Sequence, residues 1–156
     1  MNIILASASP RRKLILRRLG YRVRVMLPGI DENLYRDRSP SKLAVRLASA
    51  KAGKVAKKVK NSVIIGADTV VLCGREFVGK PDNYKDSKRI LKKLSGSKHK
   101  VITGYAVIDQ LSGKIYRGYD QSVVHFRAIP DSEIEKLARK HTVSYTHLTL
   151  PTKRIV

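Results

Sequence analysis

The chain has 156 residues, 42% of them hydrophobic, with 10 Gly, 6 Pro and no low-complexity run. This composition excludes a disordered or fibrous protein and predicts one globular core. Lys and Arg number 33 against 12 Asp and Glu, a formal net charge of +21, which favours anionic partners such as phosphorylated small molecules, nucleic acid or anionic lipid. The alternative is that most of these charges form solvated helix faces, as expected for the run Lys54, Lys57, Lys58 and Lys60.

The single cysteine, Cys73, cannot form an internal disulfide, so we expect a reducing compartment, with the cytoplasm as the default. No stretch approaches the roughly 20 consecutive apolar residues of a membrane span, and we expect no membrane partner. The 4 histidines lack a recognisable metal-ligand spacing.

The N-terminal segment predicts a strand, a helix and a second strand. Asn2–Ala6 is a short apolar run typical of a buried strand. Ser9 and Pro10 then supply an N-cap and a proline at the first helical position, and Gly20 is suited to the C-terminal cap. Tyr21–Leu27 alternates with the period of a half-buried strand. The helix has an apolar stripe that comprises Leu14, Ile15 and Leu19.

A long helix and a long strand follow the polar loop Gly29–Arg38. Ser39 before Pro40 repeats the helix start signal, and Ser62–Cys73 is a β-branched run with small residues in its middle. The apolar positions of the helix are Leu43, Leu47, Ala50, Val55 and Val59.

The rest of the chain continues to alternate between strands and helices. Ser132 and Glu135 fit the S-x-x-E capping box of a last helix. Interleaved elements of this kind predict an α/β domain, a mixed β-sheet with flanking helices. The predicted elements are a return strand at Phe77–Val78, a helix at Asn83–Leu94, strands at Val101–Ile108 and Ile115–Phe126, and a helix from Ser132 to Lys140.

The segment Ser7–Arg12 lies between a predicted strand end and a helix start. Helix N-termini offer unpaired backbone N–H groups and the positive end of the helix dipole, which together favour phosphate. Arg11 and Arg12 add donors that can bind phosphate oxygens in pairs. The alternative is that Ser9 is only a cap and the arginines are only surface charge.

The second candidate is Asp68, an acid inside an otherwise apolar strand. A buried carboxylate needs a metal, a cationic partner or a strong set of hydrogen bonds, so an acid in such a run is a site candidate. The alternative is an acid at a strand end that local backbone amides satisfy.

Three further positions carry weaker signals. Asp31 and Glu32, in the loop after the second strand, could supply metal-binding acids, and Lys80 before Pro81 could supply a phosphate-binding base. Lys51 lies on the long helix, where a lysine usually faces water.

These motifs, taken in order, closely resemble the Maf family. Any one of them is weak, but their order and spacing from residue 2 to residue 141 make the combined match specific. The matching motifs are LASASPRR at 5–12, DE at 31–32, RLASAKA at 46–52, GADTVV at 66–71, GKP at 79–81, LSG at 94–96 and TGYAV at 103–107.

The resemblance implies a fold similar to that of inosine triphosphate pyrophosphatases, often as a homodimer. It also implies hydrolysis of a nucleoside triphosphate to the monophosphate and pyrophosphate with Mg²⁺ or Mn²⁺. Asp68 would accept the proton of the attacking water, and Glu32, Asp31 and Asp68 would hold the metal. The SPRR and DT motifs resemble the subgroup that acts on dTTP and UTP. The residues implied to bind the substrate are Ser7, Arg11, Arg12, Lys51, Thr69 and Lys80.

The resemblance ends near His141, which divides the chain into a predicted incomplete Maf-like domain at 1–141 and a tail at 142–156. A glutamine that helps the pyrimidine subgroup choose its base is missing from the tail. We therefore expect a truncated reading frame with a foreign tail, and an inactive fragment is one reading of the chain.

The other alternative is a basic nucleic-acid-binding module, which the net charge of +21 supports. Against it, the sequence lacks the motifs of the common nucleic-acid-binding folds and has only 6% aromatic residues for base stacking. A nucleoside triphosphate is therefore the favoured partner.

Overall fold

The computed structural model describes residues 1–143 of the chain, and the predicted tail at 142–156 lies almost entirely outside this range. The mixed sheet and its helices confirm the predicted α/β class. No helix within the described range has the length and apolarity needed to cross a membrane. The elements in chain order are β1 (Asn2–Ala6), α1 (Pro10–Arg18), β2 (Val23–Val25), the 3₁₀ helix η1 (Glu32–Leu34), α2 (Pro40–Ala56), β3 (Ser62–Cys73), β4 (Glu76–Val78), α3 (Tyr84–Leu94), β5 (Lys98–Asp109), β6 (Ile115–His125) and α4 (Asp131–Val143).

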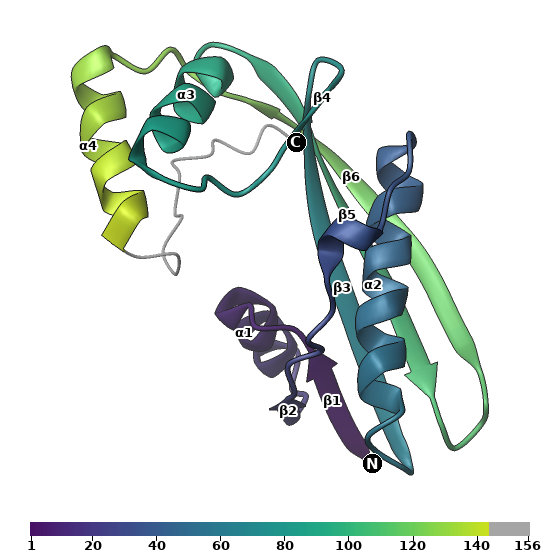
Figure 1. Ribbon diagram of the computed structural model, residues 1–156. Helices are drawn as coiled ribbons and strands as arrows, with labels where there is room; N and C mark the ends of the chain where they lie inside the picture. The colour runs from purple at the N-terminus through teal and green to yellow at the C-terminus, as the bar shows by residue number, and fades with distance from the viewer. Residues whose placement is uncertain (144–156) are drawn as a thin grey trace. The chain divides into compact units, whose positions relative to one another are not determined.

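The described strands form one six-stranded sheet in the order β2-β1-β3-β5-β6, with β4 paired to β3 (Figure 1). β1 runs parallel to β2 and β3, whereas β4 is antiparallel to β3. Ala6, the last residue of β1, lies opposite Gly66 of β3. The loop from β1 to α1 therefore leaves the sheet beside the next residues of β3, which include Asp68.

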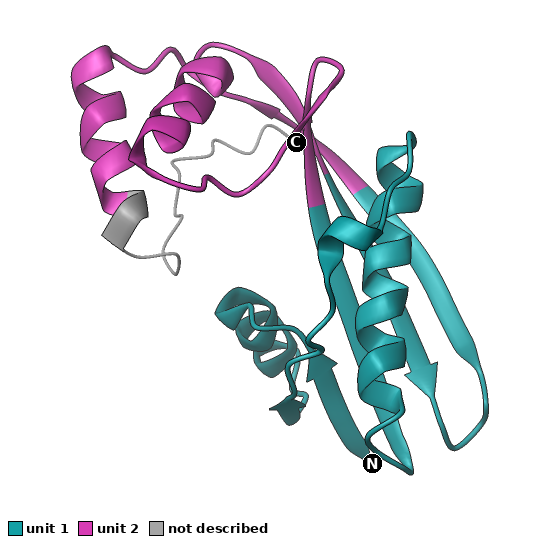
Figure 2. Ribbon diagram, viewed as in Figure 1, with its two compact units in different colours: residues 1–69, 102–120 teal, residues 70–101, 121–156 magenta. Residues whose placement is uncertain are grey.

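The chain divides into two compact units (Figure 2). Unit 1 contains residues 1–69 and 102–120, and the described part of unit 2 contains residues 70–101 and 121–143. β3, β5 and β6 contribute residues to both units.

The core of unit 1 lies where α2 covers the sheet, along β3 and β5 (Figure 1). Two sheet glycines allow the helix backbone to come unusually close. A Cβ atom on Gly66 would lie 2.2 Å from the carbonyl oxygen of Ala48, and one on Gly104 would lie 2.3 Å from the carbonyl carbon of Ala44. The helix is therefore held against the strands through backbone and methyl groups.

The buried face of α2 differs from the predicted stripe in its small residues. Leu47 and Val55 are buried as predicted, but Leu43 and Ala50 are only half-buried. The buried residues of α2 are instead Ala44, Leu47, Ala48, Lys51, Ala52 and Val55. Large side chains at the alanine positions would not fit over the two glycines, so a search for large apolar residues misplaces the face.

The apolar stripe predicted at the start of the chain is exposed in the structure. Leu14, Ile15 and Leu19 are 48%, 57% and 66% exposed, and α1 has no buried residue. Spacing shows that side chains share a helix face, but not that another element covers that face. The second strand is also shorter than predicted, because only Val23–Val25 pairs with β1.

Unit 2 is built around α3 and α4, which lie side by side and share a cluster that includes Leu91, Ile134 and Ala138 (Figure 1). The capping box predicted for α4 is wrong. The helix begins at Asp131, and the carbonyl of Pro130 accepts the first helical hydrogen bonds. Glu135 is bonded instead to Lys88 of α3, with 2.6 Å between Oε1 and Nζ.

Because α2 comes so close to Gly66, a methyl group added at Gly66 should lower the stability of the chain, whereas one added at Gly53 should not. Gly66→Ala should destabilise the chain by about 1–3 kcal/mol, because the new Cβ overlaps the α2 backbone. Gly53→Ala is the control, since a Cβ at this α2 position meets nothing within 4 Å. Removing a glycine from a helix interior should stabilise it by roughly 0.5–1 kcal/mol. Urea unfolding of both variants measures the difference, and equal effects would contradict this account of the packing.

Candidate active site

The β1–α1 loop brings two serines to the N-terminus of α1. Ser7 is buried, and its Oγ accepts a hydrogen bond from the backbone N–H of Ser9 at 3.2 Å. Ser9 is the N-cap residue, as predicted, but its side chain makes no capping hydrogen bond. The first N–H groups of the helix are therefore not occupied by their own cap, which suits an anion.

Arg12 joins this loop to β3. One guanidinium nitrogen donates to Ser7 Oγ at 3.0 Å and to the carbonyl of Ala67 at 2.9 Å. The other donates to Thr69 Oγ1 at 3.0 Å. Three hydrogen bonds of this kind hold a planar guanidinium in one orientation.

The surroundings of Arg12 act on its charge in opposite directions. Burial lowers the pKa of Arg12 most, the negative charge of Asp68 opposes that change, and the positive charge of Arg11 adds to it. The charge of Glu32 also acts to raise the pKa of Arg12. Asp68, Arg11 and Glu32 therefore all lie within electrostatic range of Arg12.

Asp68 lies on the face of β3 that α2 covers. Ser62, Ile64, Gly66 and Asp68 alternate with less buried residues, and Asp68 is 8% exposed. Its Oδ1 accepts a hydrogen bond from Lys51 Nζ of α2. The buried carboxylate therefore has a cationic partner, which is the condition for keeping a charge in an apolar strand.

Lys51 is buried, with 8% of its surface exposed, although a helix lysine usually faces water. Its ammonium group is shared by two acids, because Glu32 Oε1 lies 2.7 Å from Lys51 Nζ. Glu32 is the first residue of η1, and the Asp31 side chain caps that helix by accepting from the Asn33 N–H at 3.0 Å. The two neighbouring acids thus have different local roles.

Thr69 follows Asp68 and faces the opposite side of β3, where it is exposed. Its hydroxyl lies 2.9 Å from the hydroxyl of Thr103 on β5. Thr103 is the member of this network that residue-level reasoning missed, although it begins the TGYAV motif. A threonine at a strand position is ordinarily explained by its β-branched shape alone.

The predicted site residues of unit 1 come together through these contacts. Arg12 links Ser7 to Thr69, and Lys51 links Asp68 to Glu32. The charge of Arg11 acts on Arg12. Lys80 belongs to unit 2, between β4 and α3, and its predicted role stays a prediction. Within residues 1–143, no three His, Cys, Asp or Glu side chains gather as a ready metal site.

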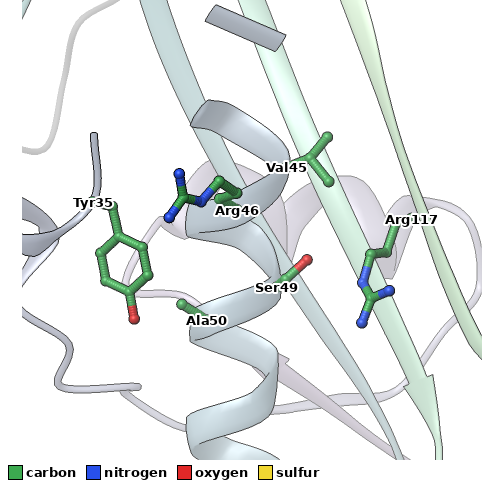
Figure 3. A pocket seen from close by; sticks show the side chains of 6 residues that line it. All are labelled: Tyr35, Val45, Arg46, Ser49, Ala50 and Arg117. Carbon is green, nitrogen blue, oxygen red and sulfur yellow. The ribbon is translucent and has the colours of Figure 1, made fainter. Parts of the chain in front are cut away.

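A hollow of about 510 Å³ lies elsewhere on unit 1, against α2 (Figure 3). Its residues do not overlap with the predicted site. Arg46 at its rim donates to the carbonyl of Arg36 at 2.8 Å, so its guanidinium is partly engaged within the protein. The hollow is lined by Tyr35, Val45, Arg46, Ser49, Ala50 and Arg117.

We expect a large loss of stability when the shared cation, Lys51, is removed. Lys51→Met should cost about 3–5 kcal/mol, because it leaves Asp68 buried without its partner. The double variant Lys51→Met/Asp68→Asn should be less destabilised than Lys51→Met alone, since the stranded charge is gone. The exposed Lys54 on the same helix supplies the control, and Lys54→Met should change stability by less than about 0.5 kcal/mol. Thermal or urea unfolding measures all three, and similar losses for Lys51→Met and Lys54→Met would contradict the buried pairing.

The chain is similar in sequence to known proteins over most of its length. A family model described as Maf-like protein matches residues 2–146. The dTTP/UTP pyrophosphatase of Geotalea uraniireducens is 44% identical over 133 residues, which are 85% of this chain and 69% of that protein. The dTTP/UTP pyrophosphatase of Clostridioides difficile is 42% identical over 135 residues, 86% of this chain and 70% of that protein.

A solved structure supports the architecture independently. The Staphylococcus aureus Ham1 protein superposes with a TM-score of 0.54 at 13% identity, covering 84% of this chain and 73% of its own. At that identity the likeness concerns the fold alone. The match to the family model, the identity to the two pyrophosphatases and the ordered motifs agree, and the chain belongs to the Maf family.

Proposed function

We propose that this protein hydrolyses a nucleoside triphosphate, with dTTP and UTP favoured, to the nucleoside monophosphate and pyrophosphate. The observation that carries the proposal is the ammonium of Lys51 shared by Asp68 and Glu32 beside the Arg12 guanidinium. The relatives named dTTP/UTP pyrophosphatase support the substrate class.

The proposed chemistry uses Asp68 as a general base. A water molecule attacks the α-phosphorus, its proton passes to the Asp68 carboxylate, and the bond between the α-phosphorus and the bridging oxygen to the β-phosphate breaks. Pyrophosphate leaves with the electron pair of that bond. Lys51 donates to the carboxylate and holds it in position, and its positive charge compensates the burial of the acid.

The cations of the site would neutralise the triphosphate. Arg11 and the N-terminus of α1 are proposed to bind phosphate oxygens, with Ser7 lining the same loop. Arg12 is held by the protein, so we assign it to a fixed positive field rather than to a flexible clamp. We also keep Lys80 as a proposed phosphate ligand.

The acids fit a hard divalent cation. Mg²⁺ and Mn²⁺ prefer carboxylate oxygens, and such sites typically use one or two carboxylates together with substrate phosphates. Asp68 and Glu32 converge on one ammonium group and supply that donor set. When bound there, the cation would stabilise the negative charge that develops on pyrophosphate. Asp31 is engaged in capping η1, so we give Glu32 the main role.

The base preference is proposed from two positions. Arg11 and Thr69 follow the SPRR and DT motifs of the pyrimidine subgroup, and not the tryptophan and DQ that mark the subgroup preferring 7-methyl-GTP. The named activities of the relatives point in the same direction.

A substrate panel tests the activity. Pyrophosphate release should be fastest with dTTP and UTP, and slower with CTP and 7-methyl-GTP. Asp68→Asn should lower kcat at least about 100-fold, because it removes the general base while keeping the side-chain shape. Equal rates for Asp68→Asn and the unaltered chain would contradict the assignment of Asp68. The absence of pyrophosphate release from every triphosphate would contradict the proposed function itself.

The metal assignment predicts different effects for two neighbouring acids. Glu32→Gln should raise the Mg²⁺ concentration needed for half-maximal activity at least about tenfold. Loss of a residue that only orients a metal ligand already weakens metal binding by about that factor. Asp31→Asn should leave that concentration nearly unchanged, since asparagine can still cap η1. Titration with MgCl₂, and with MnCl₂ followed by Mn²⁺ electron paramagnetic resonance, measures both. A larger effect of Asp31→Asn would reverse the assignment.

A further inference from the structure

Thr103 lies at the β5 end of the hydrogen-bond network that runs from the β1–α1 loop to β5. It is half-buried in β5, and its Oγ1 lies 2.9 Å from Thr69 Oγ1. Thr69 in turn accepts from Arg12, which also donates to Ser7 Oγ and to the Ala67 carbonyl. One continuous chain of polar groups therefore joins three elements of unit 1.

The hydrogen bonds of the Thr69 hydroxyl depend on Thr103. A hydroxyl has one hydrogen and two lone pairs. Arg12 already occupies one lone pair of Thr69. If Thr103 donates into the second, both lone pairs are used and the hydrogen of Thr69 is left to point outward. If Thr69 donates to Thr103, that hydrogen is consumed inside the protein.

An anion beside Thr69 selects the first arrangement. A hydrogen bond from a hydroxyl to a charged oxygen is stronger than one between two neutral hydroxyls. Thr69 is exposed, whereas Thr103 lies half-buried beside it, so only Thr69 is well placed to meet a ligand. With a phosphate oxygen present, the chain of donors would run from Thr103 to Thr69 and from Thr69 to the ligand.

We propose that Thr103 is a positioning residue that donates to Thr69 and so directs the Thr69 hydroxyl toward a phosphate oxygen of the substrate. This inference rests on the proposed function, because it requires a phosphate ligand at Thr69. Thr103 does not touch the reacting atoms. Its effect on substrate binding passes through Thr69, so it requires the hydroxyls of both Thr69 and Thr103.

Kinetics of two variants test the role. Thr103→Val removes the hydroxyl and keeps the branched shape, and should raise KM for dTTP about fivefold with little change in kcat, the pattern expected when a contact common to ground and transition states is lost. Thr103→Ser keeps the hydroxyl and should recover most of the affinity. A merely structural role would lower kcat through loss of folded enzyme and leave KM unchanged.

A double-mutant cycle separates action through Thr69 from an independent effect. The four proteins are the unaltered chain, Thr69→Val, Thr103→Val and the double variant, and the probe is the non-hydrolysable α,β-imido analogue of dTTP, measured by calorimetry with Mg²⁺. We expect the second substitution to change Kd less than about twofold in the Thr69→Val background, because residues in one network are not additive.

The outcomes distinguish the two proposals. Losses that multiply in the double variant would overturn the role of Thr103 while leaving the proposed function intact. Binding of the analogue with the expected coupling, but without pyrophosphate release from dTTP, would support Thr103 and overturn the proposed hydrolysis. If the unaltered chain does not bind the analogue, both proposals are wrong.

Discussion

The arrangement of unit 1 depends on one shared cation, the ammonium of Lys51 between Asp68 and Glu32. An acid on the covered face of β3 is unfavourable unless a positive group reaches it. That group comes from α2, and it arrives only because the helix backbone lies almost against the strand at Gly66. Close packing and charge pairing are therefore one constraint: a helix held farther from the sheet would leave Asp68 buried and unpaired.

The two cationic side chains Lys51 and Arg12 have different structural roles. Lys51 is a compact charge that joins two acids from different elements, and it sets where those acids lie. Arg12 is a planar group whose three hydrogen bonds fasten the β1–α1 loop to β3. Together they bring the β1–α1 loop next to a paired carboxylate. The net charge of +21 describes the whole chain, whereas this pairing of opposite charges is local to unit 1.

Much of the fold followed from local patterns, and the failures have physical causes. Ser39 caps α2 as predicted, because a side chain that accepts a helical N–H is a purely local signal. The burial of Lys51 did not follow, since a lysine is expected in water unless its partner is known. The exposed stripe of α1, with Ile15 57% exposed, shows that periodicity identifies a face but not its neighbour. Thr103 was missed because a contact between hydroxyls on two strands depends on how those strands pair, which one sequence does not reveal.

The alanine face of α2 has a further consequence for the entropy of folding. Three of the six buried residues of α2 are alanines, which have no rotamers to lose, so packing these positions against the sheet costs no side-chain entropy. At the same alanine positions, a local change cannot be absorbed in the usual way, which is for neighbouring side chains to adopt new rotamers. Packing α2 therefore costs little side-chain entropy at the alanine positions. Once packed, these positions cannot adapt to a local change by altering their rotamers. Such a contact holds its few polar side chains at fixed positions, while most of its own surface is chemically inert.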